Sequence, residues 1–171
     1  RLFPAYRVIG EEEKTAAARV LESGILSRFL GAWHPDFFGG PEVQTFEKIW
    51  ADICQVKHGI SVNSCTSGLY AAVGAAGVQP GDEVIVSPYT MAASATAALI
   101  FSGVPVFADI DPKTYCLSAD TIRPCITERT RAIIVVHIFG QCADMDPIME
   151  LAREHKLVVI EDCAQAPFST Y

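Results

Sequence analysis

The feature that most constrains the fold is a regular alternation of short β-rich runs with helical stretches, which begins at residue 59. The β-rich runs occupy residues 60–63, 83–87, 104–108, 132–138 and 157–160, and helical stretches lie between them at 66–77, 91–102, 118–126 and 146–155. Strands that alternate with helices of this length are typical of βαβ units and a parallel sheet. Apolar runs such as residues 133–136 indicate that both faces of the sheet are covered. The sequence therefore predicts a three-layer αβα fold with a mostly parallel sheet.

The first 58 residues follow a different pattern. Residues 11–23 have helical periodicity, and a second helix is expected to begin at Pro41, a residue that suits the first helical turn. Between these helices, glycines, prolines and aromatic residues indicate an irregular loop. We therefore predict a helical arm and loop at residues 1–58 and an incomplete α/β domain at residues 59–171.

Composition and charge argue against several classes of protein. The chain of 171 residues has a formal net charge of −7 and no Lys/Arg cluster, so broad nucleic-acid binding is not expected. No apolar stretch reaches the ~18 residues of a membrane span, and Arg1-Leu2-Phe3-Pro4 does not open an apolar signal segment. The six cysteines form no Cys-x-x-Cys pair and have no metal-like spacing with histidine. We expect a cytoplasmic protein with reduced thiols, no metal site and no membrane partner.

Polar residues follow several of the expected strands, and parallel strands present such residues at one edge of the sheet, where ligands bind. Asp162 ends the last apolar run. Its carboxylate suits the cationic ring nitrogen of a cofactor such as pyridoxal phosphate (PLP), or it caps the turn after its strand. Thr66 and Ser67 open a helix whose free N–H groups suit a phosphate, or they form an ordinary helix cap.

Two further polar residues lie at these strand ends. His137 follows the fourth strand and suits either a general base or a structural hydrogen bond, and the structural role is the better supported. Glu161 alternates with Asp162 along its strand, so only one of the two acids should face a site.

The ordered segments together resemble a known family. They are Asn63-Ser64-Cys65-Thr66-Ser67-Gly68-Leu69, Pro80-Gly81-Asp82-Glu83-Val84-Ile85-Val86, Pro88-Tyr89-Thr90, Gly103-Val104-Pro105-Val106-Phe107-Ala108-Asp109, Val136-His137-Ile138-Phe139-Gly140-Gln141 and Ile160-Glu161-Asp162-Cys163-Ala164-Gln165-Ala166. This series is similar to the DegT/DnrJ/StrS family of PLP-dependent sugar aminotransferases, which have the aspartate-aminotransferase fold (fold type I). The resemblance covers nearly the whole chain and implies part of the large domain of that fold.

The resemblance implies six cofactor-binding residues: Thr66, Ser67, Met91, Asp162, Ala164 and Gln165. The two hydroxyl residues would hold the phosphate, Asp162 would pair with the ring nitrogen, Gln165 would bond the ring hydroxyl, and Ala164 would lie against the ring. Met91 stands where the family usually has an aromatic residue that stacks on the ring, and Tyr89 is a possible substitute.

The resemblance also implies that the lysine forming a Schiff base with PLP lies beyond Tyr171. The lysines of this chain (14, 48, 57, 113 and 156) match no such motif, so no catalytic residue is assigned. We expect an N-terminal fragment that lacks the small domain, is inactive by itself, and belongs to a homodimer when complete. The implied substrates are a nucleotide-linked keto-sugar and an amino-acid donor, commonly glutamate.

Two alternatives stay open. One is a PLP-dependent deoxysugar dehydratase of the same fold, in which histidine replaces the lysine. The other is a non-catalytic truncated protein with a binding or regulatory role.

Overall fold

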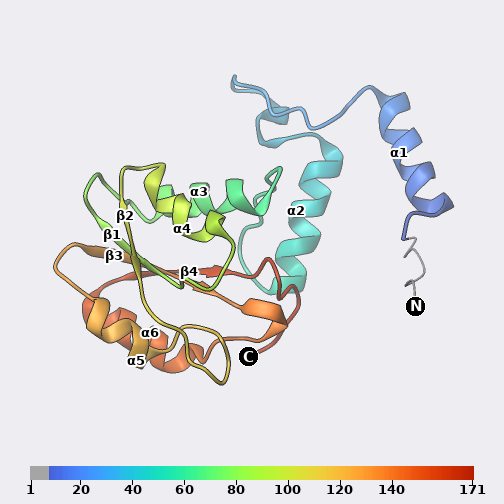
Figure 1. Cartoon of the computed structure of the whole chain (residues 1–171). Coiled ribbons are helices and arrows are strands. Elements are labelled where there is room, and N and C mark those ends of the chain that lie inside the picture. Colours follow the sequence, from blue (N-terminus) through green and yellow to red (C-terminus); the bar gives the residue numbers. More distant parts are fainter. Residues whose placement is uncertain (1–7) are drawn as a thin grey trace. The chain divides into compact units, whose positions relative to one another are not determined.

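The computed structural model describes residues 8–171, which fall into two compact units, residues 8–61 and residues 62–171 (Figure 1). The sequence pattern predicted a change from a helical arm to an α/β domain after residue 58. The initial residues Arg1-Leu2-Phe3-Pro4, which bear on the expected lack of a signal segment, lie outside the described residues.

The first unit contains the two predicted helices, α1 (Glu11–Ser23) and α2 (Pro41–Cys54), with a short 3-10 helix η1 (Pro35–Phe38) between them. α1 ends at Gly24, whose φ of 67° is a left-handed conformation that glycine adopts without strain. Pro41 occupies the first turn of α2, as expected. The aromatic loop is partly ordered by its own side chains, because the rings of Trp33 and Phe37 stack with centroids 5.1 Å apart.

The second unit is built on a parallel four-stranded sheet. Its strands are β1 (Glu83–Val86), β2 (Val104–Phe107), β3 (Thr130–Val136) and β4 (Val158–Asp162), in the order β2-β1-β3-β4. Helices α3 (Cys65–Ala75) and α4 (Ala92–Leu99) cover one face, and α5 (Ala119–Ile122) and α6 (Met145–His155) cover the other (Figure 1). The predicted three-layer αβα fold is therefore confirmed.

The core of this unit lies on both sides of the two central strands. Ile85 of β1 and Ile133 and Ile134 of β3 are fully buried, together with Ile148 and Leu151 of α6. Burial on both faces explains the continuous apolar runs 84–86 in β1 and 132–136 in β3, which do not alternate with polar residues.

Two sequence-based expectations about local structure are wrong. Residues 60–63 form no strand, because the N–H of Ser61 donates to Glu47 Oε1 at 2.7 Å instead of to a neighbouring strand. The helix expected at 118–126 is short: α5 ends at Ile122 and continues as a 3-10 turn, η2 (Arg123–Cys125). Pro124 in this turn has no N–H to extend an α-helix.

Helices within residues 8–171 are all too short or too polar to cross a membrane.

Candidate cofactor-binding site

A cavity of about 120 Å³ lies at the carboxyl edge of the sheet in the second unit. The first turns of α3 and α4 and the end of β4 form its walls. Five of the six residues predicted to bind the cofactor line it, and Ser67 does not. The lining residues are Cys65, Thr66, Leu69, Thr90, Met91, Ala93, Ser94, Val136, Asp162, Ala164 and Gln165. A complete small-molecule site usually measures about 300–1,000 Å³, so the described residues enclose only part of a ligand.

Asp162 is the buried charge of this cavity. It is the last residue of β4, lies beside Val136 at the end of β3, and is only 5% exposed. Its Oδ2 accepts a hydrogen bond from Ser94 Oγ at 2.8 Å, and its Oδ1 accepts from the N–H of Ala164 at 3.1 Å. Cys65 Sγ also donates to Oδ1, at 3.6 Å. All three donors are neutral, so the contacts orient the carboxylate without neutralising it.

Thr66 and Ser67 occupy different surroundings at the start of α3. Ser64 is the N-cap, and its Oγ accepts from the N–H of Ser67 at 3.1 Å. The Ser67 hydroxyl donates to Asn63 Oδ1 at 2.7 Å, so its side chain takes part in the capping network. The N–H groups of Cys65 and Thr66 have no acceptor within the helix. Thr66, which lines the cavity, therefore brings both a hydroxyl and a helix N-terminus to the site.

Met91, rather than Tyr89, reaches the cavity. Met91 is the N-cap of α4, lines the cavity, and is 70% exposed. Tyr89 instead packs with Tyr115 and Phe139, with ring centroids 5.9 Å and 6.1 Å apart. A flexible thioether therefore stands at the position where the resemblance implies an aromatic ring.

Ala164 and Gln165 lie just after β4, separated from it by Cys163, and also line the cavity. The side-chain oxygen of Gln165 accepts from the N–H of Phe139 at 2.9 Å. Because this contact occupies the oxygen, the NH2 group of Gln165 is left to donate to an acceptor in the cavity.

His137 makes structural contacts, as the better-supported interpretation expected. Its Nε2 lies 2.9 Å from Glu161 Oε2, and its Nδ1 accepts from the N–H of Ala143 at 3.1 Å. Hydrogen bonds to Cys163 and Glu161 raise the pKa of His137, while the Ala143 N–H opposes a second ring proton on Nδ1. Glu161 thus pairs with His137, and Asp162 is the acid that faces the cavity.

His137, Glu161 and Cys163 also lie close enough together to hold a metal ion, with ligand atoms within 4.8 Å of one another. A metal on Nε2 would need the ring proton on Nδ1, where the Ala143 N–H already points. The geometry therefore favours an Nε2–H that donates to Glu161 over a metal bond.

Ser94 and Cys65 are site residues that sequence reasoning did not assign. Ser94 is the one serine of the alanine-rich helix α4 and lies four residues after Thr90. This helical spacing of two hydroxyl residues is the sequence signal that could have identified it. Cys65 lies within the motif at the start of α3. Desolvation, and then the charge of Asp162, raise the pKa of the Cys65 thiol, which favours the protonated form that donates to Asp162.

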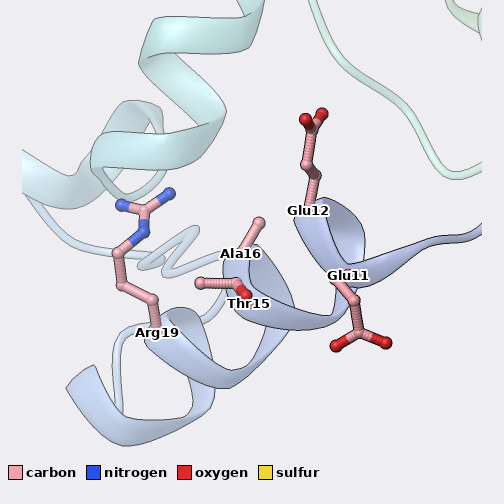
Figure 2. Close-up of a pocket in the computed structure, with 5 residues that line it drawn as sticks. All are labelled: Glu11, Glu12, Thr15, Ala16 and Arg19. Carbon is pink, nitrogen blue, oxygen red and sulfur yellow. The ribbon is translucent and has the colours of Figure 1, made fainter.

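A second hollow lies on the first unit and is formed by five residues of α1 (Figure 2). Figure 2 shows Glu11, Glu12, Thr15, Ala16 and Arg19 projecting from a single helix, none of whose residues is buried. Arg19 already pairs with Glu42, at 2.6 Å. A ligand site needs concave and mostly apolar walls, so this open surface is not a candidate site.

The chain belongs to the DegT/DnrJ/EryC1/StrS aminotransferase family, whose model matches residues 9–171. Three curated relatives are similar to this chain. The spore coat polysaccharide biosynthesis protein SpsC of Bacillus subtilis is 42% identical over 96% of this chain and 39% of its own length. GDP-perosamine synthase of Caulobacter vibrioides is 48% identical over 77% of this chain and 36% of its own length. L-glutamine:2-deoxy-scyllo-inosose aminotransferase of Streptomyces lividus is 44% identical over 91% of this chain and 36% of its own length.

Solved structures agree with the fold. An aminotransferase from Psychrobacter cryohalolentis superposes with a TM-score of 0.90 at 35% identity, over 99% of this chain and 41% of its own. The protein ntda from Bacillus subtilis, with the bound cofactor PMP, superposes with a TM-score of 0.82 at 33% identity, over 91% of this chain and 33% of its own. The expected fold type I large domain is therefore confirmed, and the family and the PMP-bound neighbour imply dependence on PLP. The chain spans about 40% or less of the length of these relatives.

Proposed function

We propose that this chain forms the cofactor-binding part of a PLP-dependent sugar aminotransferase. The observation that carries the proposal is the surroundings of Asp162. This carboxylate is buried at a strand end, and its hydrogen-bond donors within the described residues are all neutral. A buried charge without a counter-charge is costly. A protonated ring nitrogen in the cavity would supply the missing positive charge.

The other cavity residues fit the remaining groups of PLP. The N-terminus of α3 and the Thr66 hydroxyl suit the dianionic phosphate. The NH2 group of Gln165 suits the ring hydroxyl as an acceptor. Ala164 and Met91 offer apolar contact to the ring. Ser67 contributes to phosphate binding through the helix start, where its N–H donates to the N-cap Ser64, and its hydroxyl can reach the phosphate only by leaving Asn63.

When bound, PLP withdraws electrons from the carbon that carries the amino group, which lets that group move between a donor and a keto acceptor. The residues of this chain bind and orient it. Asp162 keeps the proton on the ring nitrogen through charge attraction, and the buried walls at Val136 and Leu69 limit access of water to that contact.

The substrates follow from the family. One relative is named GDP-perosamine synthase, after a GDP-linked product, and another is named L-glutamine:2-deoxy-scyllo-inosose aminotransferase, after its amino donor and acceptor. We propose a nucleotide-linked keto-sugar as acceptor for this protein. L-glutamate was the donor expected from sequence, and the second relative makes L-glutamine an equal candidate.

The lysine of the complete enzyme would come from outside this chain. All five lysines are exposed, and none is among the residues that line the cavity. A second subunit of a homodimer is proposed to complete the walls of the site, in keeping with the small volume of the cavity.

The test uses the complete gene product, titrated with PLP and followed by the near-visible absorbance of the bound cofactor and by borohydride trapping. We expect a reducible adduct, and transfer of an amino group from glutamate or glutamine to a nucleotide-linked keto-sugar, detected by mass spectrometry. Asp162→Asn should weaken PLP binding by at least tenfold. Asp109→Asn is the matched control, since Asp109 also follows a strand but is exposed.

Two results would redirect the proposal. PLP binding without a reducible adduct would favour the dehydratase. Failure of the wild-type protein to bind PLP would leave the non-catalytic alternative.

A further inference from the structure

We infer that Ser94 is a positioning residue for Asp162 and fixes which carboxylate oxygen meets the cofactor ring; this role rests on the proposed function. Ser94 lies in α4, while Asp162 ends β4, 68 residues later in the chain. Both side chains are buried and line the same cavity. Their hydrogen bond is 2.8 Å long.

The direction of the hydrogen bonds follows from the chemistry of the partners. An ionised carboxylate only accepts, so the single hydroxyl proton of Ser94 must point at Asp162 Oδ2. Ser94 Oγ also lies 3.2 Å from Thr90 Oγ1. Because the proton of Ser94 is already committed, Thr90 must be the donor in this second bond. The two hydroxyls therefore form a chain whose protons both point toward Asp162.

The acceptor positions on Asp162 identify where a ring nitrogen can bind. A carboxylate has about four lone-pair sites, two on each oxygen. Oδ1 already accepts from the N–H of Ala164 and the thiol of Cys65, whereas Oδ2 accepts from Ser94. The remaining site is on Oδ2, the oxygen that Ser94 holds. The ring N–H and the Ser94 hydroxyl would thus share one oxygen.

Because Oδ2 accepts from both groups, Ser94 would affect how Asp162 contacts the cofactor ring. The terminal bond of the carboxylate is a soft, roughly two-fold torsion. Ser94 holds Oδ2, while the Ala164 N–H and the Cys65 thiol hold Oδ1. Without the Ser94 hydroxyl, no donor within the described residues holds Oδ2, and the alignment of its contact with the ring is weakened. A serine placed only for stability would have no effect on the electronic state of the ring.

The experiment uses the complete gene product with PLP labelled with ¹⁵N at the ring nitrogen. Ser94→Ala removes the donor, and Ser94→Thr keeps it. Ser94→Cys keeps the size with a weaker donor. Thr96→Ala is the control, because Thr96 lies on the same helix and its hydroxyl bonds only to the carbonyl of Ala93, at 3.4 Å. The readouts are the dissociation constant of PLP and the ¹⁵N chemical shift of the bound ring.

We expect Ser94→Ala to raise the dissociation constant about tenfold, which is ~1.4 kcal/mol, and to move the ¹⁵N shift toward that of an unprotonated pyridine. Ser94→Cys should be intermediate, and Ser94→Thr and Thr96→Ala should match the wild type. The role is refuted if Ser94→Ala and Ser94→Cys both leave the affinity and the ¹⁵N shift unchanged while Asp162→Asn alters them. If Asp162→Asn alters neither, the proposed function fails, and the role of Ser94 fails with it.

Discussion

Glu83 offers a test of what stabilises the α/β unit, because it is a buried acid at the edge of the sheet opposite the cavity. It begins β1 and is 4% exposed. Its Oε2 accepts from the Thr127 hydroxyl, and its Oε1 accepts from Arg129 Nε and Nη2, at 3.0 Å and 2.6 Å. These contacts join β1 to the loop before β3. Glu83→Gln keeps the size of the side chain but removes the charge that strengthens both sets of hydrogen bonds.

The magnitude follows from these contacts. The Arg129 side chain is 71% exposed, so its ion pair contributes only about 0–1 kcal/mol. The hydroxyl of Thr127 bonded to a charged oxygen contributes about 1.5–3 kcal/mol. We expect Glu83→Gln to lower the free energy of unfolding by about 2 kcal/mol. With a urea slope of about 2 kcal/mol per molar, the midpoint falls by about 1 M.

The assay is urea unfolding followed by far-ultraviolet circular dichroism, with Glu128→Gln as the control. Glu128 is an exposed neighbour in the same loop, and its replacement should change stability by no more than about 0.5 kcal/mol. Equal midpoints for the two variants would refute the reasoning.

The pH dependence gives an independent check on Glu83. Hydrogen bonds from Thr127 and then Arg129 hold the pKa of Glu83 below its ordinary value. The stability that it provides is therefore complete above the unfolded pKa of about 4.3 and is lost as the pH falls through the lower folded pKa. The difference between wild type and Glu83→Gln should shrink at acidic pH.

Two other predictions concern the core and the strand ends. Ile85→Ala should lower the free energy of unfolding by about 2–5 kcal/mol, because Ile85 is fully buried. The control is Ile100→Ala, since the Ile100 side chain is 56% exposed. It should lower the free energy of unfolding by less than half as much in the same urea assay. Glu161→Gln should lower the pKa of His137, because it removes one of the two groups that raise it. The measurement is an NMR titration of the histidine ring resonances. An unchanged pKa would show that the contact between His137 and Glu161 is absent in solution.

Much of the fold could be predicted from the sequence because the α/β unit follows one rule repeatedly. Buried parallel strands are apolar on both faces, so an apolar run indicates a strand, and the residue after it lies at the carboxyl edge. By this rule Asp162 is expected at the carboxyl edge, and it lines the cavity there. Thr66 lines the same cavity, although the run 60–63 before it forms no strand. The rule fails at residues 60–63 because β-propensity reports how side chains suit a pleated surface, not whether a neighbouring strand is present.

The contacts inside the site could not be predicted in the same way. Ser94 and Asp162 are 68 residues apart, and the four-residue spacing from Thr90 to Ser94 gives no sign that Asp162 is the partner. The exclusion of Tyr89 from the cavity depends on packing with Tyr115 and Phe139, which come from other connections. Motif order gives the edge at which a residue lies, but tertiary packing decides which side chains meet there.

Glu83 and Asp162 show why one buried acid stabilises the fold while the other suits a ligand. Each is nearly inaccessible and accepts a hydrogen bond from a hydroxyl, Thr127 for Glu83 and Ser94 for Asp162. The difference is the counter-charge: Glu83 meets the guanidinium of Arg129, whereas the described donors to Asp162 are all neutral. Since an uncompensated buried charge is costly, the fold keeps at Asp162 a free-energy penalty that a cationic ring would remove on binding. We propose that this retained cost, rather than the carboxylate itself, distinguishes an acid that partners a cofactor from a structural acid at the end of a strand.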